Sequence, residues 1–118
     1  MEKFAVSKAS LRVGNVVSVL FPFSNLKGQK VRPALVLANV EFDNLILCQI
    51  TSKPYSSKTA ICIITEDFAD GFLPITSYVR PDKLFTADAT IIKNIVGQLN
   101  LKVKTKILKR VRELFTLS

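Results

Sequence analysis

The sequence predicts a mainly β domain, in which about six strands form a small barrel or strongly curved sheet and a C-terminal amphipathic α-helix follows. Two observations predict this fold class. Short apolar runs rich in β-branched residues alternate with turn signals along most of the chain, and the last segment changes to helical spacing. With 118 residues the chain is long enough for one domain with its own core, which we place at about residues 13–115.

The strands are predicted from apolar runs bounded by Gly, Pro, Asn, Asp and Ser. In chain order they are Val16–Phe21, Ala34–Leu37, Asn44–Thr51, Thr59–Thr65, Ile75–Arg80 and Ile91–Gln98. The dipeptide Asp70-Gly71 indicates a further turn, and Pro81–Asp88 is predicted to be a tight connection. This even spacing of short strands favours a barrel or curved sheet over a parallel α/β fold.

The C-terminal segment is predicted to be a helix because its apolar residues recur at intervals of three and four, with Lys and Arg between them. These apolar residues are Val103, Ile107, Leu108, Val111, Leu114 and Phe115. Asn100 is the expected N-cap, since it directly precedes the periodic segment. We expect the apolar face of the helix to cover one open end of the barrel.

The charge balance favours a polyanionic partner. Seventeen Lys and Arg against nine Asp and Glu give a net charge of +8, which suits nucleic acid or an acidic protein segment. Several of these cations follow Leu101, however, where they equally suit the solvated face of a helix. No apolar run approaches the roughly 18 residues of a membrane span, and no signal peptide is visible, so we expect a cytoplasmic protein.

The side chains that most often carry catalysis or bind zinc are scarce. The chain has no histidine, which excludes His-dependent nucleophile pairs and His-containing zinc sites. Cys48 and Cys62 each lie in an apolar run, which fits buried, reduced thiols better than a disulfide or a metal site. Catalysis would therefore depend on Arg, Lys, Asp, Glu, Tyr and hydroxyl groups. Cleavage of RNA needs no more, because the ribose 2′-OH is itself the nucleophile and the protein has only to stabilise phosphoryl charge and move protons.

The order of several short motifs resembles the MazF/PemK family of toxin endoribonucleases. The chain has G-x-V-x-x-V-x-F at Gly14–Phe21 and then RPALVL at Arg32–Leu37. Ile50-Thr51-Ser52 closes a strand, Asp70-Gly71 follows, and SYVRPDKL spans Ser77–Leu84. The resemblance runs from about Val13 to Leu114. It implies a small SH3-like barrel with a terminal helix, in agreement with the residue patterns.

The resemblance implies a catalytic group of Arg32, Thr51, Ser52, Arg80 and Asp82. Arg32, predicted to lie where a loop rejoins the second strand, can hold two phosphate oxygens with its planar fork. Thr51 matches the threonine that faces that arginine in the family, and Ser52 is its expected helper. Arg80 and Asp82 match an Arg-x-Asp motif of the PemK-like branch of the family, in which the carboxylate is assigned to proton abstraction. Each assignment has a plainer alternative: a surface ion pair for the arginines, and turn chemistry for Thr51-Ser52.

The first loop offers groups that can read the edges of unstacked bases in single-stranded RNA. These candidate substrate-binding residues are Phe23, Ser24, Asn25, Lys27, Gln29 and Lys30. Phe21 and Tyr55 can likewise stack on bases, although aromatic residues beside strands more often pack into the core. Phe23 is the better candidate of the two phenylalanines, because Pro22 breaks the strand beside it.

The resemblance further implies a homodimer that cleaves single-stranded RNA to 2′,3′-cyclic phosphate and 5′-OH ends, with no cofactor and no metal. It also implies inhibition by an acidic antitoxin whose disordered tail occupies the same basic groove. Two other classes of function remain open. A non-catalytic barrel could poison a protein target such as a topoisomerase, and a basic module could bind nucleic acid without cutting it.

Overall fold

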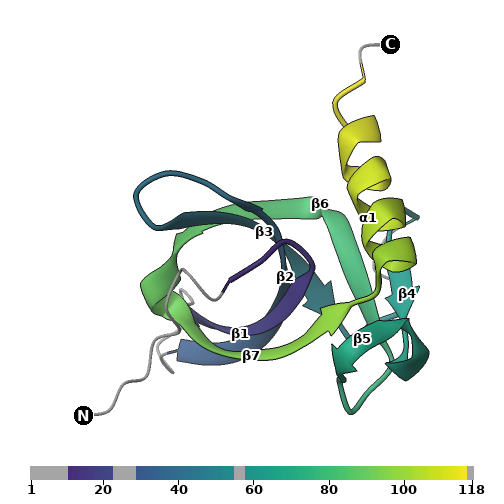
Figure 1. Ribbon diagram of the computed structural model, residues 1–118, viewed down its shortest axis with the longest axis horizontal. Coiled ribbons are helices and arrows are strands. Elements are labelled where there is room, and N and C mark those ends of the chain that lie inside the picture. Colours follow the sequence, from purple (N-terminus) through teal and green to yellow (C-terminus); the bar gives the residue numbers. More distant parts are fainter. Residues whose placement is uncertain (1–10, 23–28, 55–57, 117–118) are drawn as a thin grey trace.

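The computed structural model describes residues 11–22, 29–54 and 58–116, which form one curled antiparallel sheet and one α-helix (Figure 1). The described strands are β1 (Asn15–Pro22), β2 (Gln29–Asn39), β3 (Asn44–Thr51), β4 (Ile61–Ile63), β5 (Phe68–Gly71), β6 (Ser77–Asp88) and β7 (Ile92–Leu99). Short 3-10 turns at Thr65–Asp67 and Ala89–Ile91 precede β5 and β7, and α1 spans Leu101–Glu113. The sheet order is β4-β6-β3-β2-β1-β7-β5. The predicted mainly β fold with a C-terminal helix is confirmed.

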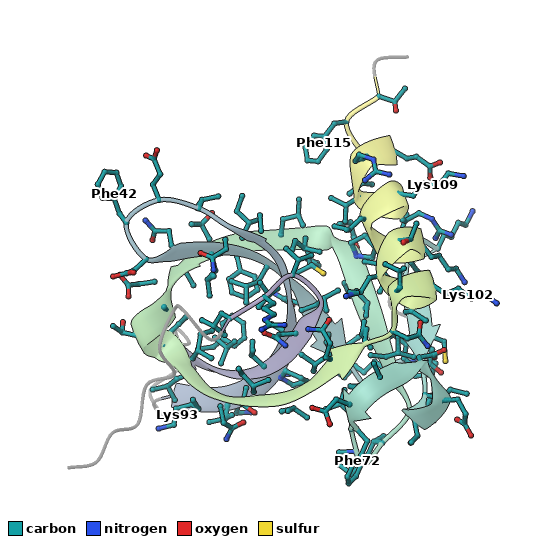
Figure 2. The ribbon with its side chains drawn as sticks, in the orientation of Figure 1. Phe42, Phe72, Lys93, Lys102, Lys109 and Phe115 are labelled. Atoms are coloured by element: carbon teal, nitrogen blue, oxygen red, sulfur yellow. The ribbon has the colours of Figure 1, made fainter. Side chains whose placement is uncertain are left out.

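The centre of the sheet is an antiparallel meander of β1, β2 and β3. The turn between β2 and β3 places Phe42 and Asp43 at positive φ, 60° and 62°, as a type I′ hairpin turn requires. The backbone N–H of Asn44 closes this turn on the Glu41 carbonyl at 3.2 Å. Phe42 projects from the tip of the hairpin into solvent (Figure 2).

Both faces of the sheet are buried, which explains the near-continuous apolar runs in the central strands. Residues of two core clusters alternate along the same strands. Val17, Val19, Ala34 and Val36 belong to one of them, here called the inner cluster, which contains no residue of α1. The second, outer cluster contains Val16, Leu35, Leu37, Cys48, Ile50, Ile61, Ile63, Val79 and Leu99, together with residues of α1.

Helix α1 begins as predicted. The Asn100 side chain accepts a hydrogen bond from the Val103 N–H at 2.9 Å and thereby caps the helix. The buried residues Val103 and Ile107 pack into the outer cluster, so the helix lies beside the ring of strands and does not cover its open end (Figure 1). Lys102 and Lys109 point away from the sheet, as expected for a solvated helix face (Figure 2).

The prediction of a tight connection at Pro81–Asp88 is wrong, because these residues continue β6. The register explains how a strand accommodates the proline. Cys48 pairs with Leu84 but its neighbour Gln49 pairs with Arg80, so residues 81–83 form a bulge outside the ladder. The missing N–H of Pro81 is tolerated there, because the bulge makes no ladder hydrogen bond with β3 at that point.

Two other local predictions need correction. Asp70-Gly71 lies at the end of β5 and pairs with β7; Gly71 has a φ of +74°, and a side chain there would collide with the Val96 carbonyl. Cys48 is buried as predicted, but the predicted burial of Cys62 is wrong. Cys62 is the middle residue of the edge strand β4, and its side chain is exposed between two buried isoleucines. No helix in the described part of the chain is long and apolar enough to cross a membrane.

Candidate active site between β2 and β3

The candidate site forms where two neighbouring strands separate. The pairing of β2 with β3 begins at Ala34 and Gln49, whereas β3 continues beyond that point as far as Thr51, which pairs with Tyr78 of β6. The first residues of β2 therefore have β1 on one side and an open gap on the other. Arg32 and Pro33 lie inside β2, and not at its entry as predicted; the proline is tolerated because no ladder with β3 exists there.

The gap contains a hollow of about 270 Å³. Its lining residues are Phe21, Arg32, Pro33, Gln49, Ile50, Thr51 and Arg80. Phe21 also packs against the inner cluster and contacts Phe85, with ring centroids 5.1 Å apart, so the hollow begins where the inner core ends. The structure thus brings together the predicted residues Arg32, Thr51 and Arg80 from three different strands.

A second hollow of about 430 Å³ adjoins the first and shares Arg32, Pro33, Ile50 and Thr51 with it. Its other lining residues are Lys30, Val31, Ser52, Lys53, Leu73, Pro74, Ile75 and Ser77. The side of this hollow toward the β5–β6 connection is apolar, and the side toward the ends of β2 and β3 is basic. Such a surface suits a nucleotide with a charged phosphate and an apolar base face.

Thr51 ends β3 with its hydroxyl in a turn. Its Oγ1 accepts a hydrogen bond from the Lys53 backbone N–H at 3.2 Å. This is the turn chemistry expected of a Thr-Ser pair, and it fixes the hydroxyl oxygen beside the hollow while its hydrogen can still be donated. Ser52 is exposed and lines only the second hollow.

Arg80 and Asp82 form the ion pair that the sequence offered as an alternative. The Arg80 Nε donates to Asp82 Oδ1 at 3.3 Å and its Nη2 donates to Oδ2 at 3.1 Å, in a two-pronged arrangement. The Arg80 side chain is 16% exposed and that of Asp82 33%. Hydrogen bonding from Arg80 holds the pKa of the Asp82 carboxyl below its usual value. Asp82 itself lines neither hollow.

The site is strongly basic. Lys30, Arg32, Lys53 and Arg80 line the two hollows, and no carboxylate of the described residues lines either of them. A phosphodiester entering the gap would therefore meet positive charge on both of its walls. Within residues 11–22, 29–54 and 58–116, no three His, Cys, Asp or Glu side chains gather closely enough to hold a metal ion.

The predicted substrate-binding residues are only partly described. Phe23, Ser24, Asn25, Lys27 and Tyr55 lie outside the described residues, as does the side chain of Gln29. Lys30 is exposed and lines the second hollow. Sequence reasoning missed Gln49 and Lys53. Gln49 could have been found, because it is the one polar residue inside the apolar run of β3.

A family model described as PemK-like, MazF-like toxin of type II toxin-antitoxin system matches residues 12–115. No curated protein matches the sequence significantly.

Solved structures resemble the fold across most of its length. A MazE-MazF complex from Deinococcus radiodurans is similar with a TM-score of 0.70 and 19% identity, over 90% of this chain and 96% of that one. An endoribonuclease from a mycobacterial species, in complex with its cognate antitoxin, is similar with a TM-score of 0.68 and 17% identity, over 90% and 95% of the two chains. The toxin MazF-mt6 of Mycobacterium tuberculosis has a TM-score of 0.62 and 20% identity, over 86% and 98%.

Proposed function

Because the chain belongs to the family of PemK-like, MazF-like toxins of type II toxin-antitoxin systems, we propose that it is a sequence-selective endoribonuclease that cleaves single-stranded RNA. The observation that carries this proposal is the gap between β2 and β3, where Arg32, Thr51 and Arg80 surround one hollow that is lined by no described carboxylate. Such a hollow is suited to a phosphodiester and its developing negative charge.

The reaction is a transesterification within the RNA. The ribose 2′-oxygen bonds to the adjacent phosphorus while the bond from phosphorus to the 5′-oxygen breaks, which leaves 2′,3′-cyclic phosphate and 5′-OH ends. The 2′-hydroxyl gives its proton to solvent water, and the leaving 5′-oxygen takes a proton from water. No metal ion is needed if the protein stabilises the charge that accumulates on the phosphoryl oxygens.

The cleft residues divide this work. Arg32 holds the non-bridging oxygens with its planar fork and donates hydrogen bonds toward the leaving oxygen, since it stays protonated throughout. Arg80 neutralises charge from the opposite wall. The Thr51 hydroxyl donates its hydrogen to the phosphate or the 2′-oxygen, because its own oxygen is already fixed by Lys53. Removal of one such donor from a preorganised site typically costs about 10²–10³ in rate.

Single-stranded RNA is the substrate class we propose, because its bases are unstacked and their faces and edges are free to contact the lining of the two hollows. The neighbouring solved complexes hold their toxins with antitoxins, and this chain's basic cleft suits an acidic antitoxin segment that would compete with RNA. We also place the protein in the cytoplasm as a homodimer, in keeping with the family.

The experiment that tests the proposal is incubation of the purified protein with mixed-sequence single-stranded RNA in EDTA, with analysis of the product ends. We expect cyclic phosphate and 5′-OH ends from the wild type, and cleavage reduced about 10²–10³-fold by Arg32→Ala. Intact RNA that stays bound would favour a non-catalytic binding module. Intact, unbound RNA would favour a toxin that acts on a protein, and equal cleavage by the variant would remove Arg32 from the mechanism.

A further inference from the structure

A continuous set of hydrogen bonds connects helix α1 with the wall of the cleft. Arg110 of the helix donates from Nη1 to the Thr59 carbonyl at 3.3 Å. The Thr59 hydroxyl donates to Asp82 Oδ1 at 3.3 Å, and Asp82 accepts the two bonds from Arg80. Arg80 lines the first hollow. The hydrogen-bonded series therefore runs from Arg110 through Thr59 and Asp82 to Arg80, and it ends at the first hollow.

Asp82 is poorly placed to remove a proton from substrate. Its side chain accepts bonds from Arg80 on both oxygens, and Oδ1 accepts a further one from Thr59. Each of these bonds stabilises the ionised carboxylate, which is why its pKa is lowered, and a carboxylate with a lowered pKa is a weaker base. Asp82 also lines neither hollow. Its contact with the cleft runs through Arg80.

The bonds to Asp82 also determine which part of Arg80 faces a ligand. A guanidinium has five N–H donors, and two of them are used by Asp82. The donors that remain are both hydrogens of Nη1 and one of Nη2, on the outer edge of the fork. This edge can hold two phosphate oxygens side by side.

Holding the Arg80 side chain in one orientation costs rotamer entropy, because a long side chain is otherwise free to move in water. Contacts that fix Asp82 reduce this cost. The bulge at residues 81–83 carries Asp82 out of the ladder, so backbone pairing does not fix it. Thr59 precedes β4, and its hydroxyl holds the carboxylate from the second side. Arg110 is half-buried and fixes the Thr59 backbone to the helix.

We propose that Thr59 is a positioning residue for RNA cleavage: together with Asp82 it holds the Arg80 guanidinium in the cleft, and Arg110 anchors it to helix α1. This inference rests on the proposed endoribonuclease function. It adds Thr59 and Arg110, which are far from Arg80 in sequence, to the residues that support cleavage. It assigns Asp82 to orienting Arg80 in place of proton abstraction.

The test compares Thr59→Val, which keeps the shape and removes the donor, with Thr59→Ser, which restores the donor. Thr86→Val is the matched control, since Thr86 is an exposed threonine on β6 outside both hollows. We expect Thr59→Val to lower kcat about threefold to tenfold, the effect of one hydrogen bond, with KM little changed. Thr59→Ser should recover most of that loss, and Thr86→Val should match the wild type.

The contribution of Arg110, at the helix end of the hydrogen-bonded series, is tested in the same way. Arg110→Met keeps the aliphatic stem and removes the donor, and Arg112→Met is its control on an exposed position of the same helix. We expect a smaller loss of kcat for Arg110→Met than for Thr59→Val, because the former acts through one more contact. Thermal unfolding of each variant shows whether a loss of activity merely follows a loss of fold.

A spectroscopic readout keeps the inference separate from the proposed function. A guanidinium held by two carboxylate oxygens rotates slowly about its Nε–Cζ bond, so nitrogen NMR should resolve separate Nη signals for Arg80 in the wild type. We expect Thr59→Val to broaden or merge them. Unchanged Arg80 signals and unchanged kcat in Thr59→Val would overturn the inference even if RNA is cleaved. If the wild type leaves RNA intact, the proposed function fails, and the Arg80 signals still decide whether Thr59 holds this side chain.

Discussion

Binding of single-stranded RNA should weaken steeply with salt, because four cations among the described residues line the two hollows: Lys30, Arg32, Lys53 and Arg80. If each displaces the counterion of one phosphate, the logarithm of the association constant should fall against the logarithm of salt concentration with a slope of about −2.8. Asp82 offsets Arg80, and three effective cations would give about −2.1. The larger slope means about a 50-fold loss of affinity when salt rises fourfold.

The assay is fluorescence anisotropy with a 2′-O-methyl RNA, which lacks the nucleophile and stays intact. Lys53→Ala should reduce the steepness of the slope by about 0.7. The control is Lys93→Ala, which removes an exposed lysine of β7 that lines neither hollow (Figure 2). It should leave the slope unchanged. Equal slopes for the two variants, or a greater effect of Lys93→Ala, would refute the reasoning that these hollows hold the phosphates.

Three further predictions follow from single residues. Arg32→Lys keeps the charge but loses the fork, so its cleavage rate should lie between those of the wild type and Arg32→Ala in single-turnover kinetics; a rate equal to wild type would show that charge alone suffices. Ile107→Ala should lower the free energy of unfolding by about 2–5 kcal/mol in urea titrations, because Ile107 is fully buried on the inner face of α1. Leu101→Ala should change it little, because Leu101 is 74% exposed. Alkylation at pH 8, followed by mass spectrometry, should modify exposed Cys62 and spare buried Cys48. Burial, with a smaller effect of the Asp82 charge, raises the pKa of Cys48 to about 12, so little reactive thiolate forms. Modification of Cys48 in the folded protein would contradict its burial.

Local sequence rules predicted elements whose own residues decide their structure. The strand Asn44–Thr51 has the predicted bounds, because a dense apolar run follows a turn signal. Helix α1 and its Asn100 cap follow from spacing and one side chain. Pro81 misled the prediction, since a proline inside a run normally breaks a strand. Whether a strand can continue past it depends on the partner strand, and the bulge opposite Cys48 and Gln49 is invisible in a single sequence.

The candidate site was harder to predict than the fold. Arg32 and Thr51 were singled out through family resemblance, and nothing local indicates that they share a hollow. Their proximity arises from register, because β2 and β3 separate just beyond the pair Ala34 and Gln49. Thr59 carried no signal at all, since its partner Asp82 lies on another strand.

In the proposed reaction, this cleft promotes attack by a ribose 2′-oxygen on the adjacent phosphorus. The most direct test uses an oligodeoxynucleotide of a cleaved sequence with a single ribonucleotide on the 5′ side of the scissile phosphate, compared with the same strand in all-deoxy form. We expect cleavage of the first strand at that one phosphate, with a cyclic phosphate end, and no cleavage of the second strand although it still binds. Cleavage of the all-deoxy strand would contradict attack by the 2′-oxygen, because the nucleophile would then have to come from elsewhere.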